Sequence, residues 1–253
     1  MSLAWSLFLF FGFGALSSFI GAITGLGGGF ILIPLLTIIG QLDIKDAIFF
    51  SLACILWLSV LRMHHNRELI RQHQSVIRQF ILFTLMGSAL AAYLGARAPS
   101  ELLSKIFSIL LLTMSAYFFW DHRSQGSDST AKPWSPIWGK MILFCSGSLG
   151  GLLGIGGGVI NVPTLHKMFG YPMTQATQLS FPFVFVSAMT ALIVYINQRK
   201  EALLNLSPLI LLVLLIGTFA GSKLATKTKL STSRVKLIFA AMIGIIGLIK
   251  LFN

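Results

Sequence analysis

The sequence predicts an all-α, polytopic integral membrane protein. Three observations support this class: 55% of the 253 residues are hydrophobic, only 10% are charged, and the mean hydropathy is +0.85. A soluble domain carries about 25% charged residues. A soluble chain of this length could not bury so much apolar surface, so the composition excludes an ordinary soluble enzyme, a disordered chain and a disulfide scaffold.

The apolar runs predict eight to ten transmembrane or re-entrant helical segments. They cover residues 3–40, 47–61, 79–96 and 106–120, and then 141–165, 168–198, 202–222 and 237–249. Lys and Arg at the ends of the shorter runs can snorkel to the interface and lengthen them. The first run has no basic segment before it, so we expect a retained helix and not a cleaved signal peptide.

The chain repeats itself in sequence. GLGGG at residues 25–29 returns as GIGGG at residues 154–158, 129 positions later. The same offset pairs Pro34 with Pro163, Ala47 with Ala176 and Ser51 with Ser180. Residues 1–121 and 137–253 therefore read as two copies of one unit, joined by the polar, Ser-, Gly- and Pro-rich linker 122–136.

The glycine segments predict two helix breaks inside the membrane. Each glycine costs a helix about 1 kcal/mol relative to alanine, so four in five positions should end it. Pro34 and Pro163 follow as further breaks. Broken backbone is tolerated only where it lines a protein-enclosed cavity, and the helix that restarts presents N–H groups that favour anions. Paired breaks of this kind point to the binding site of a transporter.

The alternative is close helix packing through small residues four apart, as at Gly217 and Gly221. Helix packing explains a single pair of small residues four apart. It explains less well two separate segments that each have four glycines in five positions. The segments do not match a nucleotide-binding loop, because neither copy continues as G-x-G-x-x-G or ends in GK[ST], and no strand precedes it.

The candidate substrate-binding residues are these glycines and the polar side chains near them. They are Gly25, Gly27, Gly28, Gly29, Gly154, Gly156, Gly157, Gly158, Asn161, Ser51, Gln178 and Ser180. Asn161, three residues after GIGGG, is the strongest single candidate. Each polar side chain could instead join helices. The seven acidic residues all lie at run edges or in loops, which suits an anion better than a cation.

Other polar residues give weaker signals. Asp43 and Asp46 follow the first break and suit either a gate or proton carrier or a solvated loop with Lys45. His64 and His65 stand among arginines and predict a basic loop, and no Cys/His spacing predicts a metal or another cofactor. Cys54 and Cys145 both lie in apolar runs, so we expect two buried free thiols.

Basic residues between the apolar runs indicate positive-inside anchoring and not nucleic-acid binding. If each half crosses five times, with residues 30–39 as a short crossing, 13 of the 19 Lys and Arg share one side. That side has Arg62, Arg67, Arg71, Arg78, Arg123, Lys132, Lys140, Lys167, Lys223, Lys227, Lys229, Arg234 and Lys236. This asymmetry favours inverted halves with both termini outside. Length argues the other way, because residues 159–169 reach only about 16 Å.

The doubled motif resembles that of the TauE/SafE family of sulfite exporters. The matching segments are GLGGGFILIP with AIFFS, and GIGGGVINVP with ATQLS. The resemblance implies a transporter of small sulfur-containing anions, such as sulfite or organosulfonates. The two copies differ, because Leu32 stands where Asn161 is and Asp46 where Gln175 is.

Together these observations predict a non-enzymatic secondary transporter in the plasma (inner) membrane. It would export a small sulfur-containing anion by alternating access between the repeats. Because no ATP-binding motif is present, we expect an ion gradient to drive transport, with protons as a candidate coupling ion. A channel is a close variant. The alternatives are a membrane-embedded sulfur-handling enzyme or carrier that uses Cys54 or Cys145, and a structural subunit in which the glycines only pack helices.

Overall fold

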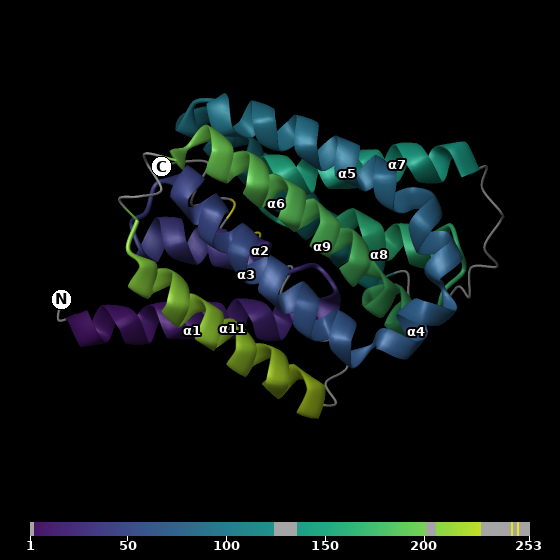
Figure 1. The fold of residues 1–253 in the computed structure, drawn as a ribbon, viewed down its shortest axis with the longest axis horizontal. Helices are drawn as coiled ribbons and strands as arrows, with labels where there is room; N and C mark the ends of the chain where they lie inside the picture. The colour runs from purple at the N-terminus through teal and green to yellow at the C-terminus, as the bar shows by residue number, and fades with distance from the viewer. Residues whose placement is uncertain (1–2, 124–135, 201–205, 229–243, 245–246, 248–253) are drawn as a thin grey trace.

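The computed structural model describes residues 3–123, 136–200 and 206–228 together with Gly244 and Gly247, and its elements there are all helical (Figure 1). In chain order they are α1 (Leu3–Thr24), α2 (Gly29–Pro34), the π-helix η1 (Leu35–Ile39), α3 (Ile44–His65), α4 (Arg67–Gln72), α5 (Gln74–Arg97), α6 (Ser100–Arg123), α7 (Pro136–Leu153), α8 (Gly158–Lys167), α9 (Met173–Gln198) and α11 (Pro208–Lys227). The all-α prediction is confirmed. Most of the linker 122–136 and of the run 237–249 lies outside the described residues.

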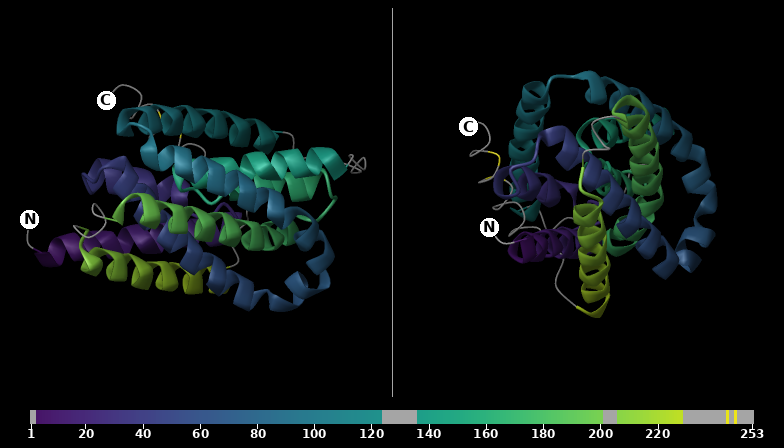
Figure 2. Two further views of the ribbon diagram at one scale, coloured as in Figure 1. Left: turned by 45° about the horizontal axis from the view of Figure 1, so that its top comes forward. Right: turned by 60° about the vertical axis from the view of Figure 1, so that its left-hand side comes forward.

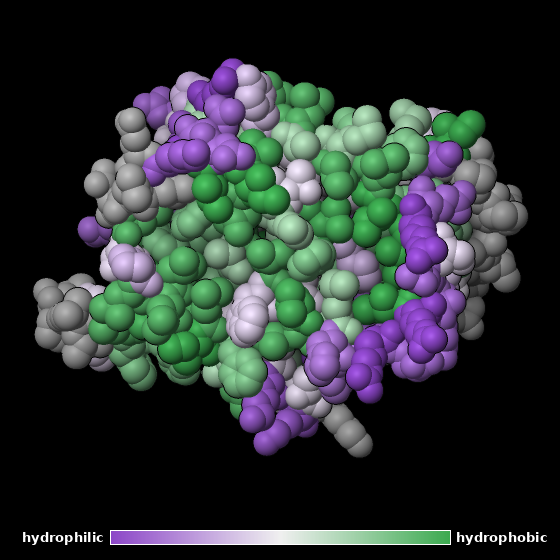
Figure 3. All heavy atoms as spheres, viewed as in Figure 1, coloured by the Kyte–Doolittle hydropathy of each residue, from purple (hydrophilic) through white to green (hydrophobic). Residues whose placement is uncertain are grey.

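Six of these helices, α1, α3, α5, α6, α9 and α11, are long and apolar enough to cross a membrane. Residues 29–39 and 137–153 form shorter apolar helices. Large apolar side chains also cover the outside of the bundle, for example Phe8, which is 67% exposed. Figure 3 shows hydrophobic side chains across the middle of one face, with hydrophilic ones gathered at its lower right and upper left. This distribution is the one expected of a multi-pass membrane protein.

The first glycine segment is the tip of a re-entrant hairpin. After the break, α2 and η1 run back along α1, because Ile39 and Gly40 line a cleft with Ser6 and Phe13 of α1. The returning arm of 11 residues reaches about 16 Å, half the thickness of a bilayer. The five-crossing arrangement predicts that residues 30–39 cross the membrane, whereas here they return to the end of the molecule where α1 began. We call residues 3–40 the first hairpin and residues 25–28 its tip.

The second glycine segment is the tip of a similar hairpin. The rings of Phe169, just after α8, and Phe80 lie 5.2 Å apart in an edge-to-face contact. Both rings also lie close to Gly139, in the first turn of α7. The chain after α8 therefore comes back to where α7 began. We call residues 136–170 the second hairpin and residues 154–157 its tip.

The two hairpins enter from opposite ends of the molecule. Asp46 at the start of α3 pairs with Arg199, which follows α9. At the other end, the rings of His73 and Tyr171 lie 5.1 Å apart, which joins the chain beyond α3 to the chain before α9. Hence α3 and α9 are antiparallel. The bases of the two hairpins lie at opposite ends of the molecule, and the tip of each hairpin points toward the base of the other.

Each hairpin packs on a long helix from the other half of the chain. In α11, Gly217 and Gly221 lie against the backbone of Phe11 and Ala15 in α1. In α7, Gly147 and Gly151 lie against the backbone of Thr84 and Ser88 in α5. Figure 2 shows α1 beside α11 in both views. The small-residue packing considered for Gly217 and Gly221 is therefore present, and it joins the two halves.

The antiparallel arrangement predicts the sidedness of three positions. Arg67 begins α4, just after the end of α3, and Lys227 ends α11. Because Ala225 of α11 packs with Leu58 of α3, the ends of α3 and α11 lie at the same end of the molecule. Lys45 lies at the opposite end. In a chain carrying Cys54→Ala and Cys145→Ser, single cysteines at Arg67 and Lys227 should react with a membrane-impermeant maleimide from one side, and a cysteine at Lys45 from the other.

Labelling of sealed vesicles of both orientations measures this directly. If cysteines at positions 67 and 227 react from opposite sides, the antiparallel arrangement of α3 and α9 across the membrane is wrong.

Candidate functional site

Each tip bends through three glycines with positive φ. The angles are 75° at Gly25, 85° at Gly27 and 82° at Gly28, and 67° at Gly154, 78° at Gly156 and 70° at Gly157. Only glycine adopts these left-handed conformations at little cost. The helices therefore end at Thr24 and Leu153 and restart at Gly29 and Gly158, where the sequence predicts the breaks.

The two tips contact each other backbone to backbone, and the contact is reciprocal. A Cβ at Gly29 would lie 2.6 Å from the carbonyl oxygen of Gly154. A Cβ at Gly158 would overlap the carbonyl oxygen of Gly25 and lie 2.9 Å from the Cα of Leu26. Adding 129 to Gly29 gives Gly158, and subtracting 129 from Gly154 gives Gly25, so the second contact is the first with the two halves exchanged, as in an interface between two symmetry-related copies.

Two predicted site residues fasten this contact. The Ser51 hydroxyl of α3 donates to the carbonyl oxygen of Gly154 at 2.7 Å. The Ser180 hydroxyl of α9 lies 3.0 Å from the carbonyl oxygen of Gly25 and 2.8 Å from that of Thr177, and its one proton is shared between them. Both serines are fully buried. Their protons satisfy carbonyls that the broken helices leave without a partner. The sequence offered them as substrate donors, whereas in this structure they bond the tip of the opposite half.

Asn161 is the predicted site residue that keeps a free donor. Its Oδ1 accepts from the Ser146 hydroxyl at 2.5 Å, and that hydroxyl also lies 2.7 Å from the carbonyl oxygen of Gly157. The side chain is fully buried, yet its Nδ2 has no hydrogen-bond partner. In this orientation of the amide, the Asn161 Nδ2 is a buried donor without a partner, which costs about 1–3 kcal/mol.

The helix that carries Asn161 adds backbone donors. Ile160 and Asn161 are the first residues of α8 whose N–H groups turn back to Gly157. The N–H groups of the first turn before them have no intrahelical acceptor, and the positive end of the helix dipole lies there. An oxyanion near the second tip would therefore find both the Asn161 amide and a favourable backbone field.

Thr177 is a further buried polar residue beside the first tip. Its hydroxyl oxygen is buried without a partner, and its methyl group crowds Gly25 of the first tip. Gln178 is only partly buried, and helical spacing turns it about 100° from Thr177. Thr177 and Asn161 both come from the second half, where the first half has the apolar Ile48 and Leu32.

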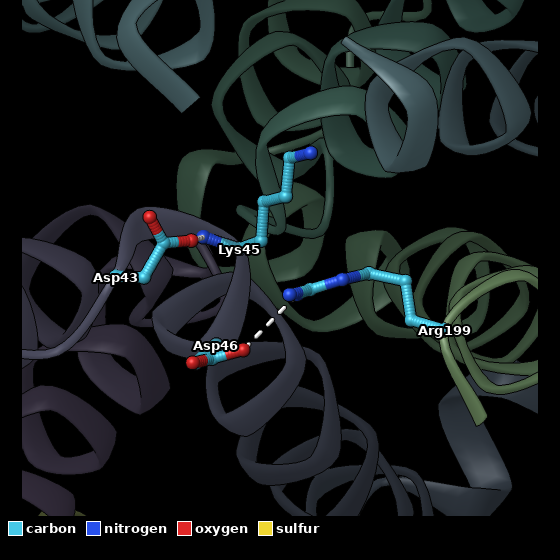
Figure 4. Close-up of polar contacts among 4 residues, drawn as sticks. All are labelled: Asp43, Lys45, Asp46 and Arg199. Carbon is cyan, nitrogen blue, oxygen red and sulfur yellow. Dashed lines mark hydrogen bonds and ion pairs between the residues drawn. The ribbon is translucent and has the colours of Figure 1, made fainter. Parts of the chain in front are cut away.

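The two aspartates have separate roles at the base of the first hairpin (Figure 4). Asp43 caps α3 by accepting from the backbone N–H of Lys45 at 2.8 Å. Asp46 pairs with Arg199 at 3.0 Å, and both side chains are partly buried. The Asp46–Arg199 pair therefore joins α3 in the first half to the end of α9 in the second half. A solvated loop, one of the two expectations for these aspartates, would make no such contact.

Several expectations are corrected. Cys54 is buried, but Cys145 lies exposed on α7, because an apolar run also covers helix surfaces that face lipid. The expected basic loop is helical, since His64 and His65 end α3 and Arg67 begins α4.

His166 hydrogen-bonds the Tyr171 carbonyl at 2.8 Å. Partial burial raises the pKa of the Tyr171 phenol, because desolvation disfavours its anion. Among the described residues, no group of three or more His, Cys, Asp or Glu could hold a metal.

Comparison with known proteins adds an independent line of evidence. The model of a family described as "Sulfite exporter TauE/SafE" matches residues 10–249. A "Probable membrane transporter protein" of Methanocaldococcus jannaschii is 25% identical, over 94% of this chain and 92% of that protein. Another from Bacillus subtilis is 26% identical, over 92% of this chain and 93% of that protein. No solved structure matches.

The tip contact predicts the effect of a single methyl group. Gly158→Ala should destabilise the protein by about 1–3 kcal/mol or more, because its Cβ meets the opposite backbone, which cannot yield as a side chain does. Gly12→Ala is the matched control, since a Cβ there meets nothing within 4 Å and should stabilise α1 slightly. Thermal unfolding in detergent measures both, and equal melting temperatures would contradict the tip contact.

Proposed function

Since this chain belongs to the sulfite exporter TauE/SafE family, we propose that it exports a small sulfur-containing oxyanion, sulfite or an organosulfonate, across the plasma membrane. It is a membrane transporter, as its family and the names of its relatives indicate, and not an enzyme. The observation that carries the choice of an anion is the buried Nδ2 of Asn161 beside the second tip, a donor without a hydrogen-bond partner.

The proposed binding region lies where the two tips meet. The glycines Gly25, Gly27, Gly28 and Gly29, and Gly154, Gly156, Gly157 and Gly158, let the chains approach closely, while Asn161 and the start of α8 supply donors. Among the described residues, the fully buried polar side chains include no carboxylate that would repel an anion. A packing-only role for the glycines gives no reason for the unpartnered Nδ2 of Asn161 beside them.

We propose that residues 1–121 and 137–253 are inverted copies of one unit. The proposal is supported by the reciprocal tip contacts, by the paired Ser51 and Ser180 hydrogen bonds, and by the antiparallel α3 and α9. Inverted repeats are the usual architecture of transporters that alternate between two open states. Rocking of one repeat against the other would expose the tips to each side in turn.

Different contacts close the two ends of the proposed pathway. At one end, Asp46 and Arg199 join α3 to the end of α9, and Arg97 donates to Gln198 at 3.3 Å. At the other, Phe169 of the second hairpin contacts Phe80 of α5, and Tyr171, just after that hairpin, contacts His73, just before α5. Breaking one set while keeping the other is the requirement for alternating access. The driving force would be an ion gradient, with protons as the candidate coupling ion.

Asn161→Leu tests the anion site, because the first half carries leucine at the corresponding position 32 and tolerates it there. Losing a hydrogen bond to a charged ligand costs about 1.5–3 kcal/mol, so affinity should fall about tenfold or more. The affinity is measured by thermal stabilisation, since a ligand at 100 times its Kd adds about 2.7 kcal/mol. The anions to test are sulfite, sulfate, thiosulfate, sulfoacetate, taurine, phosphate and chloride.

The exposed Asn197→Leu is the control and should bind as the wild type does. If no anion stabilises the wild-type protein, the proposed substrate class is wrong.

The Asp46–Arg199 pair predicts a change of access without a large change of stability. A partly exposed pair contributes only about 0–1 kcal/mol, so Asp46→Asn should hardly alter unfolding. It should nevertheless raise maleimide labelling of a cysteine at the buried Ala47 several-fold, and the charge swap Asp46→Arg with Arg199→Asp should reverse the increase.

Asp43→Asn preserves the helix cap and should leave labelling unchanged. Equal labelling in all four proteins would mean that the pair does not close this end.

A further inference from the structure

Arg62 is a buried cation that the proposed site has not yet used. It lies in the last turn of α3, is 9% exposed, and is the one charged residue among the buried polar side chains of the described part of the chain. Its Nε and Nη1 are buried and have no hydrogen-bond partner. The guanidinium therefore holds unused donors inside the protein.

Although Arg62 lies near the end of α3, its side chain is directed into the protein and not out to the adjacent surface. Long basic side chains near a helix end usually reach out to the interface. The neighbouring His64 and His65 are exposed, whereas the Arg62 guanidinium carbon lies 5.8 Å from the ring centre of Phe181 in α9. Contact with an aromatic face offsets only part of the cost of burying a cation.

The surroundings of Arg62 connect it to the first tip. Phe181 packs with Leu58, one turn before Arg62, and with Ala22, three residues before Gly25. The residue before Phe181 is Ser180, which donates to the Gly25 carbonyl. Arg62 therefore lies on the side of the first tip that faces α4 and the end of α11, where Arg67 and Lys227 are exposed.

We propose that Arg62 binds the transported oxyanion on its way between this basic end and the tips. The inference rests on the proposed function. Two nitrogens of a guanidinium can bond two oxygens of a sulfite or sulfonate group at once, which satisfies the donors and neutralises the buried charge together. A buried charge without a partner is costly, and an anionic ligand removes that cost when it binds.

The proposed contact exists on one side only. Adding 129 to 62 gives Ala191, which is fully buried and offers no donor. Among the described residues, the second half thus has no cation at the position that corresponds to Arg62. If the basic end is cytoplasmic, as positive-inside anchoring indicates, an anion that leaves the cell meets Arg62 before it meets the tips.

Binding of sodium sulfite to the purified full-length protein tests the proposal, by calorimetry and by thermal unfolding with and without sulfite. Arg62→Gln should weaken sulfite affinity at least tenfold, and Arg62→Lys, which keeps the charge but loses the fork, by a smaller factor. Without sulfite, Arg62→Gln should melt at the wild-type temperature or above it, because the variant no longer buries an unpaired charge. Arg67→Gln, an exposed basic residue at the same end, should bind sulfite as the wild type does.

A purely structural role gives the opposite pattern. Arg62→Gln would then melt at a lower temperature and bind sulfite with unchanged affinity, which would overturn the proposal but leave the proposed function intact. If Arg62→Gln does not fold, wild-type affinity in Arg62→Lys overturns it equally. An equal loss in Arg62→Gln and Arg67→Gln would assign the effect to general surface charge. If the wild-type protein binds neither sulfite nor any other anion tested, the proposed function fails along with this inference.

Discussion

The backbone contact between the two glycine tips is the constraint on which the rest of the structure depends. A broken helix inside a membrane leaves polar backbone groups that neither lipid nor bulk water can satisfy. Here the tips cover each other, and Ser51 and Ser180 donate to the exposed carbonyls. A returning arm of 11 residues reaches only half a bilayer, so two such tips can meet only if they enter from opposite ends. The antiparallel course of α3 and α9 follows from this requirement.

Sequence reasoning located the elements more reliably than the contacts between them. Glycine cost, hydropathy and the 129-residue offset predicted both helix breaks and the all-α class, because these depend on local composition. They did not predict that Ser51 and Ser180 donate to backbone, because each bond joins residues more than 100 positions apart. Hydropathy also predicted that Cys145 is buried, because lipid and the protein interior are equally apolar. It placed the buried Arg62 in a basic loop, because a loop is expected just beyond the end of an apolar run and Arg62 lies there.

The two halves share an architecture but differ in chemistry. Asn161 and Thr177 have apolar counterparts in Leu32 and Ile48, and Arg62 has its counterpart in Ala191. Backbone shape thus follows the repeat, while the buried polar groups do not. Such a site presents different groups to the two ends of a ligand. An asymmetric ion such as an organosulfonate, with a charged head and an organic tail, would therefore be held in one orientation.

The exchange of helices between the halves has a consequence for how the protein is made. Ser18 of α1 hydrogen-bonds Thr218 of α11, a residue synthesised 200 positions later. Throughout that interval α1 lacks the surface on which it finally packs, and the same holds, over a shorter span, for α5 before α7 emerges. Neither half can reach its final packing while the other is missing. Assembly is therefore a late event that waits for α11, and a chain that stalls before α11 leaves the face of α1 with Gly14, Ala15 and Ser18 open to wrong partners.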